Sequence, residues 1–201
     1  MEREEWNRRY ASSELLWSAT PNSILVGQVV HRPGGRALDV GCGEGRNSIW
    51  LAEHGWRVTG VDFSDAGLDK ARRLAAAKGV SADWVLADLR SYRPAPRSYD
   101  LVVVLYLHLP SDELGPVHAA CADALRPAGA LIVLGHDLTN LTEGYGGPQE
   151  ASVLITPEDV AGEISAVEGI TVERAERVER RVSTDTGERV AIDALVRAVR
   201  S

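Results

Sequence analysis

Three glycines at alternate positions, Gly41, Gly43 and Gly45, follow a short apolar run that contains one acidic residue, Asp39. A glycine-rich turn after a strand lets the backbone approach a ligand closely, and a helix that follows offers free N–H groups. The stretch therefore predicts a nucleotide-type site. Its spacing is G-x-G-x-G, and Arg46 stands where the dinucleotide motif has its third glycine, which argues against NAD.

Two further acidic residues close the next two expected strands. Asp62 follows the glycine turn by about 20 residues, where an acid can accept hydrogen bonds from both hydroxyls of a ribose. Asp88 ends the third strand, within reach of an adenine amino group. Each acid alone is compatible with a helix cap, but suitable residues at three successive strand ends favour an adenosine-containing ligand over a plain tight turn.

Two histidines at later strand ends are the candidate catalytic bases. His108 closes the fourth expected strand and His136 closes the fifth, so both reach the same sheet edge as the glycine turn. An imidazole titrates near neutral pH, and either residue can take a proton from an acceptor. The alternative is that each only orders its adjoining loop. A structural role is expected for the remaining histidines: His31, His54 and His118.

The elements that must position these residues alternate along the chain. Apolar runs typical of strands occupy residues 36–40, 57–61, 82–87, 99–107, 130–136, 170–183 and 189–200. Helical patterns occupy residues 44–54, 65–78 and 112–126, begin again at 157 and are expected within 1–30. Alternation of this kind predicts a parallel sheet covered on both faces. We therefore predict an α/β fold with a doubly wound, mostly parallel seven-stranded sheet and a C-terminal antiparallel hairpin.

Length and composition indicate one soluble domain. The chain has 201 residues, of which 44% are hydrophobic and 25% charged, and its formal net charge is −7. A negative surface repels nucleic acid and anionic membranes, so neither is expected as a partner. Cys42 and Cys121 suggest neither a disulfide framework nor a metal site. The N-terminus lacks the apolar segment of a signal peptide, and we expect a cytoplasmic monomer or homodimer.

The single expected domain, residues 1–201, has four parts. Residues 1–35 form a helical cap, 36–136 the ligand-binding core, 137–156 a loop, and 157–201 a helix with the terminal hairpin. Long loops at the ligand edge are usually lids or contact the substrate, although a flexible insert without function is the alternative. This loop has no Lys or Arg cluster, which argues against a strongly anionic substrate. The candidate substrate residues are Trp17, His108, His136, Asp137, Asn140, Tyr145 and Gln149.

Several segments together resemble the successive motifs of class I S-adenosylmethionine-dependent methyltransferases. They are "ALDVGCGEGRNSIWLAEHGWRVTGVDFS", "ADL", "YDLVVVLYLHL" and "LRPAGALIVLGHD". The stretch "GCGEGRN", with Trp6, Arg9 and Tyr10 near the N-terminus, is most similar to the small tellurite-resistance and thiopurine-type enzymes. Ala128 departs from the family, which usually has a second glycine there. The resemblance implies the Rossmann-like methyltransferase fold, S-adenosyl-L-methionine as cofactor and S-adenosyl-L-homocysteine as product.

The resemblance also implies a role for each motif residue. The implied contacts are Asp39 and the backbone of Gly41, Cys42 and Gly43 with the methionine amino group, Asp62 with the ribose, Phe63, Asp88 and Leu89 with the adenine, Leu105 and Tyr106 with the sulfonium region, and Arg46 and Tyr10 with the methionine carboxylate. Methyl transfer is an in-line displacement in which the protein mainly holds the acceptor in place.

Three functions remain open on the sequence. The first is methyl transfer to a small molecule that carries a thiol, phenol, amine or chalcogen oxyanion. The second is a non-catalytic protein that binds the cofactor or its product as a regulator or partner. The third, a nicotinamide-dependent oxidoreductase, is disfavoured by Arg46.

Overall fold

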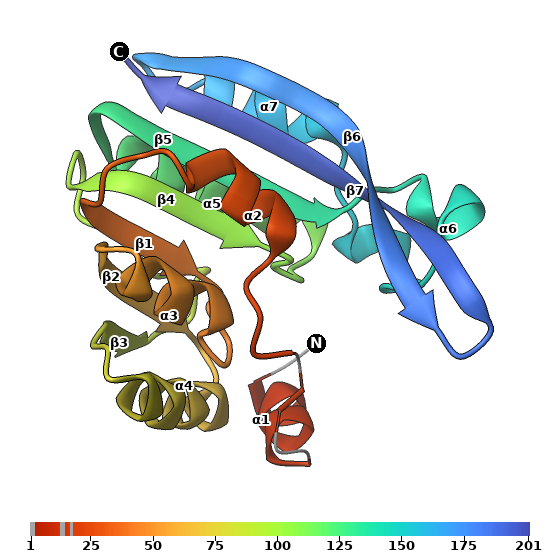
Figure 1. The fold of residues 1–201 in the computed structure, drawn as a ribbon. Helices are drawn as coiled ribbons and strands as arrows, with labels where there is room; N and C mark the ends of the chain where they lie inside the picture. Colours follow the sequence, from red (N-terminus) through yellow and green to blue (C-terminus); the bar gives the residue numbers. More distant parts are fainter. Residues whose placement is uncertain (1–2, 13–14, 17) are drawn as a thin grey trace.

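The computed structural model describes residues 3–12, 15–16 and 18–201 and shows a single twisted sheet between two layers of helices (Figure 1). The strand order is β3-β2-β1-β4-β5-β7-β6. The strands are β1 (Arg36–Val40), β2 (Arg57–Asp62), β3 (Asp83–Leu86), β4 (Tyr99–Leu105), β5 (Leu125–His136), β6 (Ile170–Thr184) and β7 (Gly187–Arg200). Neighbouring strands from β3 to β5 pair in parallel, and β7 is antiparallel to β5 and β6. The predicted fold class is confirmed.

Helices cover both faces because the central strands are apolar on both sides. They are α1 (Arg3–Ala11), α2 (Ser23–Val29), α3 (Arg46–Glu53), α4 (Asp65–Lys78), α5 (Ser111–Asp123), α6 (Asn140–Glu143) and α7 (Pro157–Ser165), with one 3₁₀ turn, η1 (Ala151–Val153). Val102 and Val104 of β4 pack in one cluster with α5 and α7. Leu101 and Val103 pack in the opposite cluster with α2 and α3. An apolar run without alternation is what burial on both faces requires.

Local signals fix the ends of α4 and α7. Ser64 Oγ accepts a hydrogen bond from the Gly67 N–H at 3.0 Å, and α4 stops at Gly79, whose φ is +69°. Thr156 caps α7 in the same way, and Pro157 occupies the first turn, where its missing N–H leaves no bond unmade. Both helices therefore begin where the sequence predicts.

Several boundaries were predicted wrongly, among them the end of β4, at Leu105 rather than 107, and the start of β7, at Gly187 rather than 189. The first helix of the core begins at Arg46 rather than at 44, because the glycine turn continues to Gly45. Strand β5 begins at Leu125 rather than at 130, and α5 accordingly ends at Asp123. The early start was hidden because residues 126–129 bulge out of the pairing with β4, so the apolar pattern is interrupted there.

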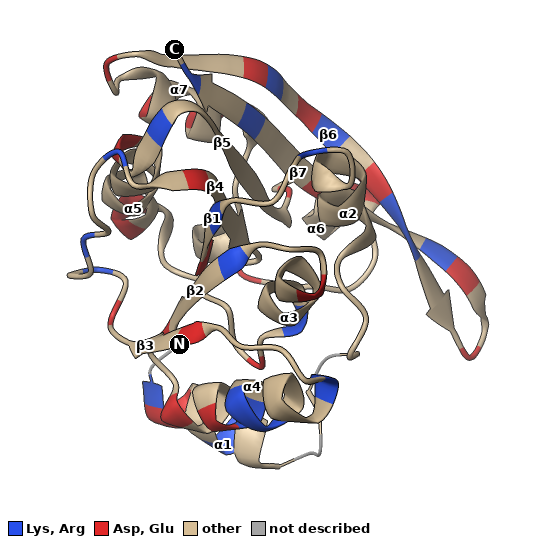
Figure 2. Cartoon of the chain, turned by 60° about the vertical axis from the view of Figure 1, so that its left-hand side comes forward, with Lys and Arg blue, Asp and Glu red and all other residues tan. Residues whose placement is uncertain are grey.

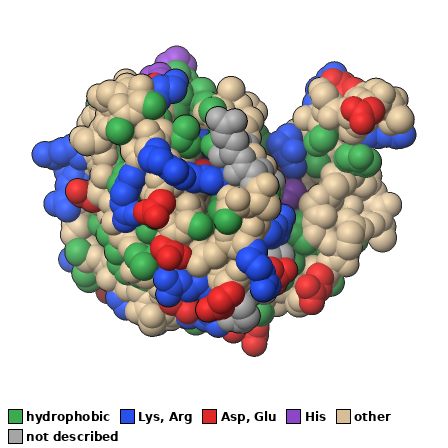
Figure 3. Space-filling view, turned by 90° about the horizontal axis from the view of Figure 1, so that it is seen from below, with side chains coloured by type: hydrophobic (Ala, Val, Ile, Leu, Met, Phe, Trp, Pro, Cys, Tyr) green, Lys and Arg blue, Asp and Glu red, His purple; other side chains and the backbone are tan. Residues whose placement is uncertain are grey.

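Strands β6 and β7 extend beyond the rest of the sheet. Pairing of β5 with β7 ends at His136 and Asp193, whereas β6 and β7 stay paired as far as Thr184 and Gly187. Residues 179–192 are called the arm below; Figure 1 shows them projecting past the end of β5. Seen from below, the surface is hollowed on this side, with His and Lys or Arg side chains in the hollow (Figure 3).

Acidic and basic side chains alternate along β6 and are mixed on α4 (Figure 2). Helix α1 packs against α4, outside the sheet. Among the described residues, the helices are all too short or too polar to cross a membrane.

Candidate active site

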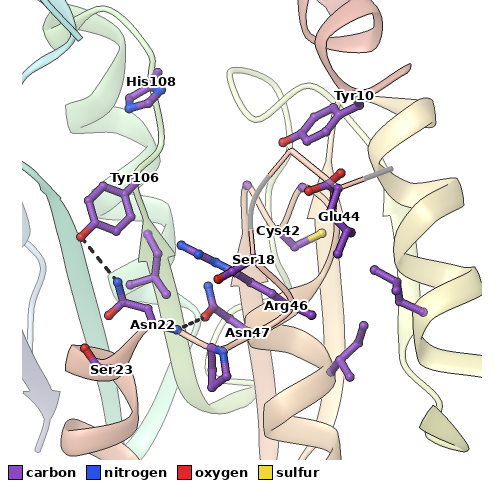
Figure 4. A pocket seen from close by; sticks show the side chains of 18 of the residues that line it. Tyr10, Ser18, Asn22, Ser23, Cys42, Glu44, Arg46, Asn47, Tyr106 and His108 are labelled. Atoms are coloured by element: carbon purple, nitrogen blue, oxygen red, sulfur yellow. Dashed lines mark hydrogen bonds between the residues drawn. The ribbon is translucent and has the colours of Figure 1, made fainter. Parts of the chain in front are cut away.

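A cavity of about 390 Å³ lies beyond the carboxyl ends of β1, β4 and β5 (Figure 4). This is the edge at which parallel α/β sheets bind ligands. Its walls come from the glycine turn, the start of α3, the segment before α2, the ends of β4 and β5, and the arm. The predicted site residues that line it are Tyr10, Gly41, Cys42, Gly43, Arg46, Leu105, Tyr106, His108 and His136.

The glycine turn needs its glycines both for conformation and for space. Gly41, Gly43 and Gly45 have φ values of +75°, +53° and +79°. A Cβ on Gly43 would stand 2.6 Å from the Tyr10 hydroxyl, and one on Gly45 would stand 2.7 Å from the Trp84 ring. The backbone of the turn therefore packs closely against Tyr10 of α1 and Trp84 of β3, and it also borders the cavity.

Asp62 is bonded to the glycine turn itself. Its carboxylate accepts hydrogen bonds from the backbone N–H of Gly43 and of Ser64, both at 2.8 Å. Burial raises the pKa of Asp62, and these backbone N–H groups partly offset the rise. The carboxylate is thus fixed at the end of β2, where the remaining lone pairs suit ribose hydroxyls.

Asp39 lies behind the glycine turn rather than on the cavity wall. It is 1% exposed and accepts a hydrogen bond from Ser48 Oγ at 2.6 Å. Burial raises its pKa to about 6. Because burial disfavours the charged form of this carboxyl, a cation brought to the turn would interact favourably with it.

Arg46 extends from the first turn of α3 across the cavity toward Tyr106 (Figure 4). Burial lowers the pKa of its guanidinium. Within the described chain, no hydrogen bond or ion pair satisfies this side chain, so the cavity contains a cation that calls for an anionic group. Cys42, beside it, is a poor nucleophile because burial raises the pKa of its thiol.

Residues predicted to contact the adenine lie at the β2–β3 edge and do not line the cavity. Leu89 is buried under the glycine turn, and Phe63 is half-buried. Asp88 is exposed and accepts hydrogen bonds from the backbone and side chain of Arg90. Their contact with an adenine stays a prediction.

Helix α1 brings two aromatic rings to the cavity. Trp6 and Tyr10 are buried and stacked, with 5.5 Å between their centroids. Asn7 fixes the helix, because it accepts from Ser64 Oγ and donates to Asp65 at the start of α4. Trp17 lies outside the described residues.

The candidate bases stand side by side. The rings of His108 and His136 are nearly parallel, with centroids 5.9 Å apart, and Trp6 stacks on the far side of His108 at 6.1 Å. Burial lowers the pKa of His108 to about 4. Its Nε2 is buried and has no hydrogen-bond partner among the described residues. His108 is therefore neutral near pH 7.

A buried carboxylate that the sequence did not reveal lies next to His136. Asp193 of β7 is 0% exposed, and His136 Nδ1 lies 3.3 Å from its Oδ1. Its other oxygen accepts hydrogen bonds from the Tyr106 hydroxyl and from Arg180 Nε, each at 2.7 Å. Burial alone would raise the pKa of Asp193, but its interactions with His136, Arg180 and Tyr106 outweigh burial and lower it. The signal available was one acid inside the apolar run "VAIDALV".

The candidate substrate residues of the 137–156 loop do not line the cavity. Asp137 is buried and accepts from Thr139 and Arg177, and Asn140 binds the backbone of Gly146 and Ile192. These side chains hold the loop against the arm. Two others, Tyr145 and Gln149, are exposed.

The segment before α2 forms one wall of the cavity, and sequence reasoning missed how it is held. Both carboxylate oxygens of Glu44, in the glycine turn, accept from the Leu16 N–H at 3.0 Å. Asn47 Oδ1 accepts from the Asn22 N–H at 2.9 Å. The residues sit in "GEGRN", but nothing in that motif shows which distant backbone they bind.

Residues 37–129 match the family described as methyltransferase domain. The ubiquinone biosynthesis O-methyltransferase of Klebsiella pneumoniae is 34% identical over 118 residues, which cover 55% of this chain and 48% of that protein. The chain thus spans about half the length of the curated relatives it matches.

Solved structures share the fold across nearly the whole chain. One similar structure was described under the conversion of a disulfide bond into a thioacetal group during echinomycin biosynthesis. It has a TM-score of 0.76 at 22% sequence identity, and the match covers 99% of this chain and 92% of that chain. Magnesium protoporphyrin IX methyltransferase of Synechocystis, with bound S-adenosylhomocysteine, has a TM-score of 0.64 at 21% identity and covers 99% and 83%. The same Rossmann-like architecture is present in all three chains.

Proposed function

We propose that this chain is a class I S-adenosylmethionine-dependent methyltransferase, and that it methylates a small molecule bound between the glycine turn and the arm. One observation carries the proposal: a single cavity of about 390 Å³ joins the glycine turn to the two histidines. A cofactor held at the turn and an acceptor held at the histidines would meet in the same cavity.

The residues present fit S-adenosyl-L-methionine. The glycine turn forms a cradle that a Cβ on Gly43 would fill, and Arg46 is a half-buried cation without a partner among the described residues. We propose that Arg46 and Tyr10 hold the methionine carboxylate, Asp39 and the turn the amino group, and Asp62 the ribose. When bound, this cofactor supplies a methyl group activated by a sulfonium.

The protein's own part in the reaction is positioning. Leu105, the last residue of β4, and Tyr106, which follows it, lie on the cavity wall, and Trp6 and His108 form the adjoining wall. Holding an acceptor at near van der Waals contact and excluding water accounts for most of what such a reaction needs. The adenine contacts of Phe63, Asp88 and Leu89, and a lid role for residues 137–156, belong to the same proposal.

The charge balance of the cavity supports an acceptor that is not strongly anionic. The arm places Arg180 and Arg181 on the wall, a cationic contribution that the loop sequence did not predict. Arg180 is paired with Asp193 and Arg181 with Glu188. Among the described residues, Arg46 is then the one arginine of the cavity wall without an ion pair. The carboxylate of the cofactor would supply its negative partner.

Transfer assays test this function. The chain is incubated with S-adenosylmethionine labelled in its methyl group and a panel of phenols, thiols, amines and chalcogen oxyanions, and labelled product is measured. Binding of S-adenosylhomocysteine and of NADH is measured in parallel by calorimetry. We expect S-adenosylhomocysteine to bind and at least one acceptor to be labelled. Binding of S-adenosylhomocysteine without transfer to any acceptor would favour a regulatory protein, and tight binding of NADH alone would exclude the proposal.

A further inference from the structure

We propose that His136 is the catalytic base, that Asp193 is its positioning residue, and that the acceptor therefore arrives with its proton still in place, on a hydroxyl or thiol. This inference rests on the proposed methyl transfer and deepens it. It separates protic acceptors from chalcogen oxyanions, which need no base.

The first step is the way Asp193 is held. It lies on β7 directly opposite His136 of β5 in the antiparallel register, so the sheet itself fixes the two residues together. Tyr106, after β4, and Arg180, on β6, each donate a hydrogen bond of 2.7 Å to Asp193. Four strands thus converge on one fully buried carboxylate, and two donors keep it charged.

The second step concerns the ring of His136. Its Nδ1 faces Asp193 Oδ1 at 3.3 Å and has no aligned hydrogen bond to any described residue. A base whose bond is long in a site without substrate can tighten when the acceptor binds. With Nδ1 turned toward a carboxylate, the proton belongs on Nδ1, and Nε2 is left with the lone pair that can accept the acceptor's proton.

The 137–156 loop supports the same ring. A Cβ on Gly147, whose φ is +74°, would stand 3.0 Å from His136 Nδ1 and 3.1 Å from Cε1. Backbone therefore packs directly over the face of the ring on its Nδ1 side, where only glycine fits. This contact gives the loop a positioning role, although its polar side chains do not line the cavity.

The third step distinguishes the two histidines. No carboxylate lies beside His108, and its buried Nε2 has no hydrogen-bond partner among the described residues. Its neighbours are the rings of Trp6 and His136. A protonated His108 would have no counter-charge, whereas a protonated His136 would lie against Asp193. The geometry thus favours His136 as the residue that receives the proton.

The proton and electrons balance without any further reagent. The O–H or S–H bond of the acceptor breaks, and its proton moves to Nε2 of His136. The acceptor atom keeps the electron pair and uses it to bond to the methyl carbon, while the pair of the broken carbon–sulfur bond stays on sulfur. Asp193 balances the imidazolium until the proton leaves to water.

The first test reads the proton position directly. Protein labelled with ¹⁵N in histidine is examined by NMR for the tautomer of His136, in the chain as it is, in Asp193→Asn and in Asp185→Asn, a matched change in the exposed turn of the same hairpin. We expect the Nδ1–H tautomer in the unchanged chain and in Asp185→Asn, and a mixture in Asp193→Asn. An Nε2–H tautomer in the unchanged chain overturns the proposal even if Asp193→Asn does not fold.

The second test varies the acidity of the acceptor. Rates of transfer to a series of substituted phenols are measured for His136→Ala, Asp193→Asn and His108→Ala, with S-adenosylhomocysteine affinity as the check on folding. For phenols protonated at the assay pH, we expect losses of about 100-fold in His136→Ala and about tenfold in Asp193→Asn. For phenols already ionised, both losses should fall below about threefold, and His108→Ala should show no such trend.

The outcomes separate this inference from the proposed function. If the unchanged chain methylates nothing, the proposed function fails. If it methylates acceptors but only ionised ones, or if His136→Ala slows ionised and protonated phenols equally, methyl transfer stands and the inference is overturned.

Discussion

The two halves of the sheet treat buried carboxylates differently. On the β1–β3 side, Asp62 is held by backbone N–H groups 2 and 19 positions away in sequence, and burial raises its pKa. On the β5–β7 side, Asp193 is held by side chains, one of them 87 positions away, and its pKa is lowered. Asp62 thus has only uncharged donors among the described residues, whereas Asp193 is paired with the cation Arg180.

The two halves also differ in which residues adopt a left-handed backbone. Around the β1 turn, Gly41, Gly43 and Gly45 take the positive φ values at little steric cost. In the other half, Gly146 and Gly147 also take positive φ values, of +72° and +74°, but so do two non-glycine residues: Tyr106, at +54°, and Ala128, at +63°, which lies at the start of β5, away from the cavity. The glycine turn is thus conformationally relaxed, while the β4–β7 half stores backbone strain at Tyr106 and Ala128 that surrounding contacts must hold.

The largest expected effect is on the ion pair beneath the glycine turn. Lys70 Nζ lies 2.9 Å from Glu44 Oε1, and both side chains are nearly fully buried. Lys70→Met should lower the free energy of unfolding by about 3 kcal/mol, because it removes a nearly fully buried cation that lies against the Glu44 carboxylate. Urea denaturation measures this. Arg72→Met, which breaks an exposed pair with Asp69 on the same helix, should change stability by less than about 0.5 kcal/mol. Equal effects in the two variants would refute a special role for burial here.

The next prediction separates the two halves by ligand. Asp62→Ala should weaken binding of S-adenosylhomocysteine by about 100-fold, or about 2.7 kcal/mol, because the ribose and the Gly43 N–H both lose an acceptor. Arg180→Gln, on the acceptor side, should change that affinity by less than about twofold while slowing transfer. Calorimetry gives the affinities. If Arg180→Gln weakens cofactor binding as much as Asp62→Ala, the division of the site is wrong.

A pH effect should belong to the cofactor side. Burial raises the pKa of Asp39 to about 6, so in the free protein this carboxyl gains a proton as the pH falls through 6. A ligand ammonium needs the charged form, and affinity for S-adenosylhomocysteine should fall by up to about tenfold for each pH unit below 6. Calorimetry between pH 5 and pH 8 measures the slope. Asp39→Asn should bind more weakly at pH 7.5, with a flatter profile; an unchanged slope would exclude Asp39 as its source.

The raised pKa of Asp39 has the opposite effect on the stability of the free protein. The folded state keeps the Asp39 proton to about pH 6, whereas the unfolded chain, with an ordinary pKa near 3.8, has already released it. This residue therefore reduces stability as the pH rises from about 4 to 6, and ligand binding restores it.

The smallest expected effect tests backbone strain at the start of β5. Ala128→Gly should raise the free energy of unfolding by about 0.5 kcal/mol, since relief of a left-handed alanine exceeds the added backbone entropy of glycine. Ala76→Gly, at an exposed position in the last turn of α4, should lower it by up to about 1 kcal/mol. Chemical denaturation of both variants gives the comparison, and destabilisation by both would show that the bulge at 126–129 is unstrained.

The strand ends around the glycine turn were predictable from the sequence because their information is local, whereas the cofactor contacts of these residues stay predictions. One turn and the next two strand ends placed Asp39, Asp62 and the glycines, and strand–helix alternation gave the sheet. The strand β5 start was missed because a bulge interrupts its apolar pattern.

The acceptor side was predictable only in part. His136 was found at a strand end, but its partner Asp193 and the arm residue Arg180 meet it only through antiparallel pairing of the last strands. Asp137 and Asn140 were taken as substrate residues because they are polar and near the site. Their hydrogen bonds to the loop and to β7 are tertiary contacts that residue type does not reveal.

The bond between Glu44 and the Leu16 N–H links the cavity wall to the turn beneath it. A ligand that stabilises the turn must also slow amide hydrogen exchange at Leu16 and Asn22, although neither amide needs to touch it. Exchange rates of these two amides thus report occupancy of the site before any acceptor is known. Compounds can be screened against the chain by that signal alone, without a product to detect.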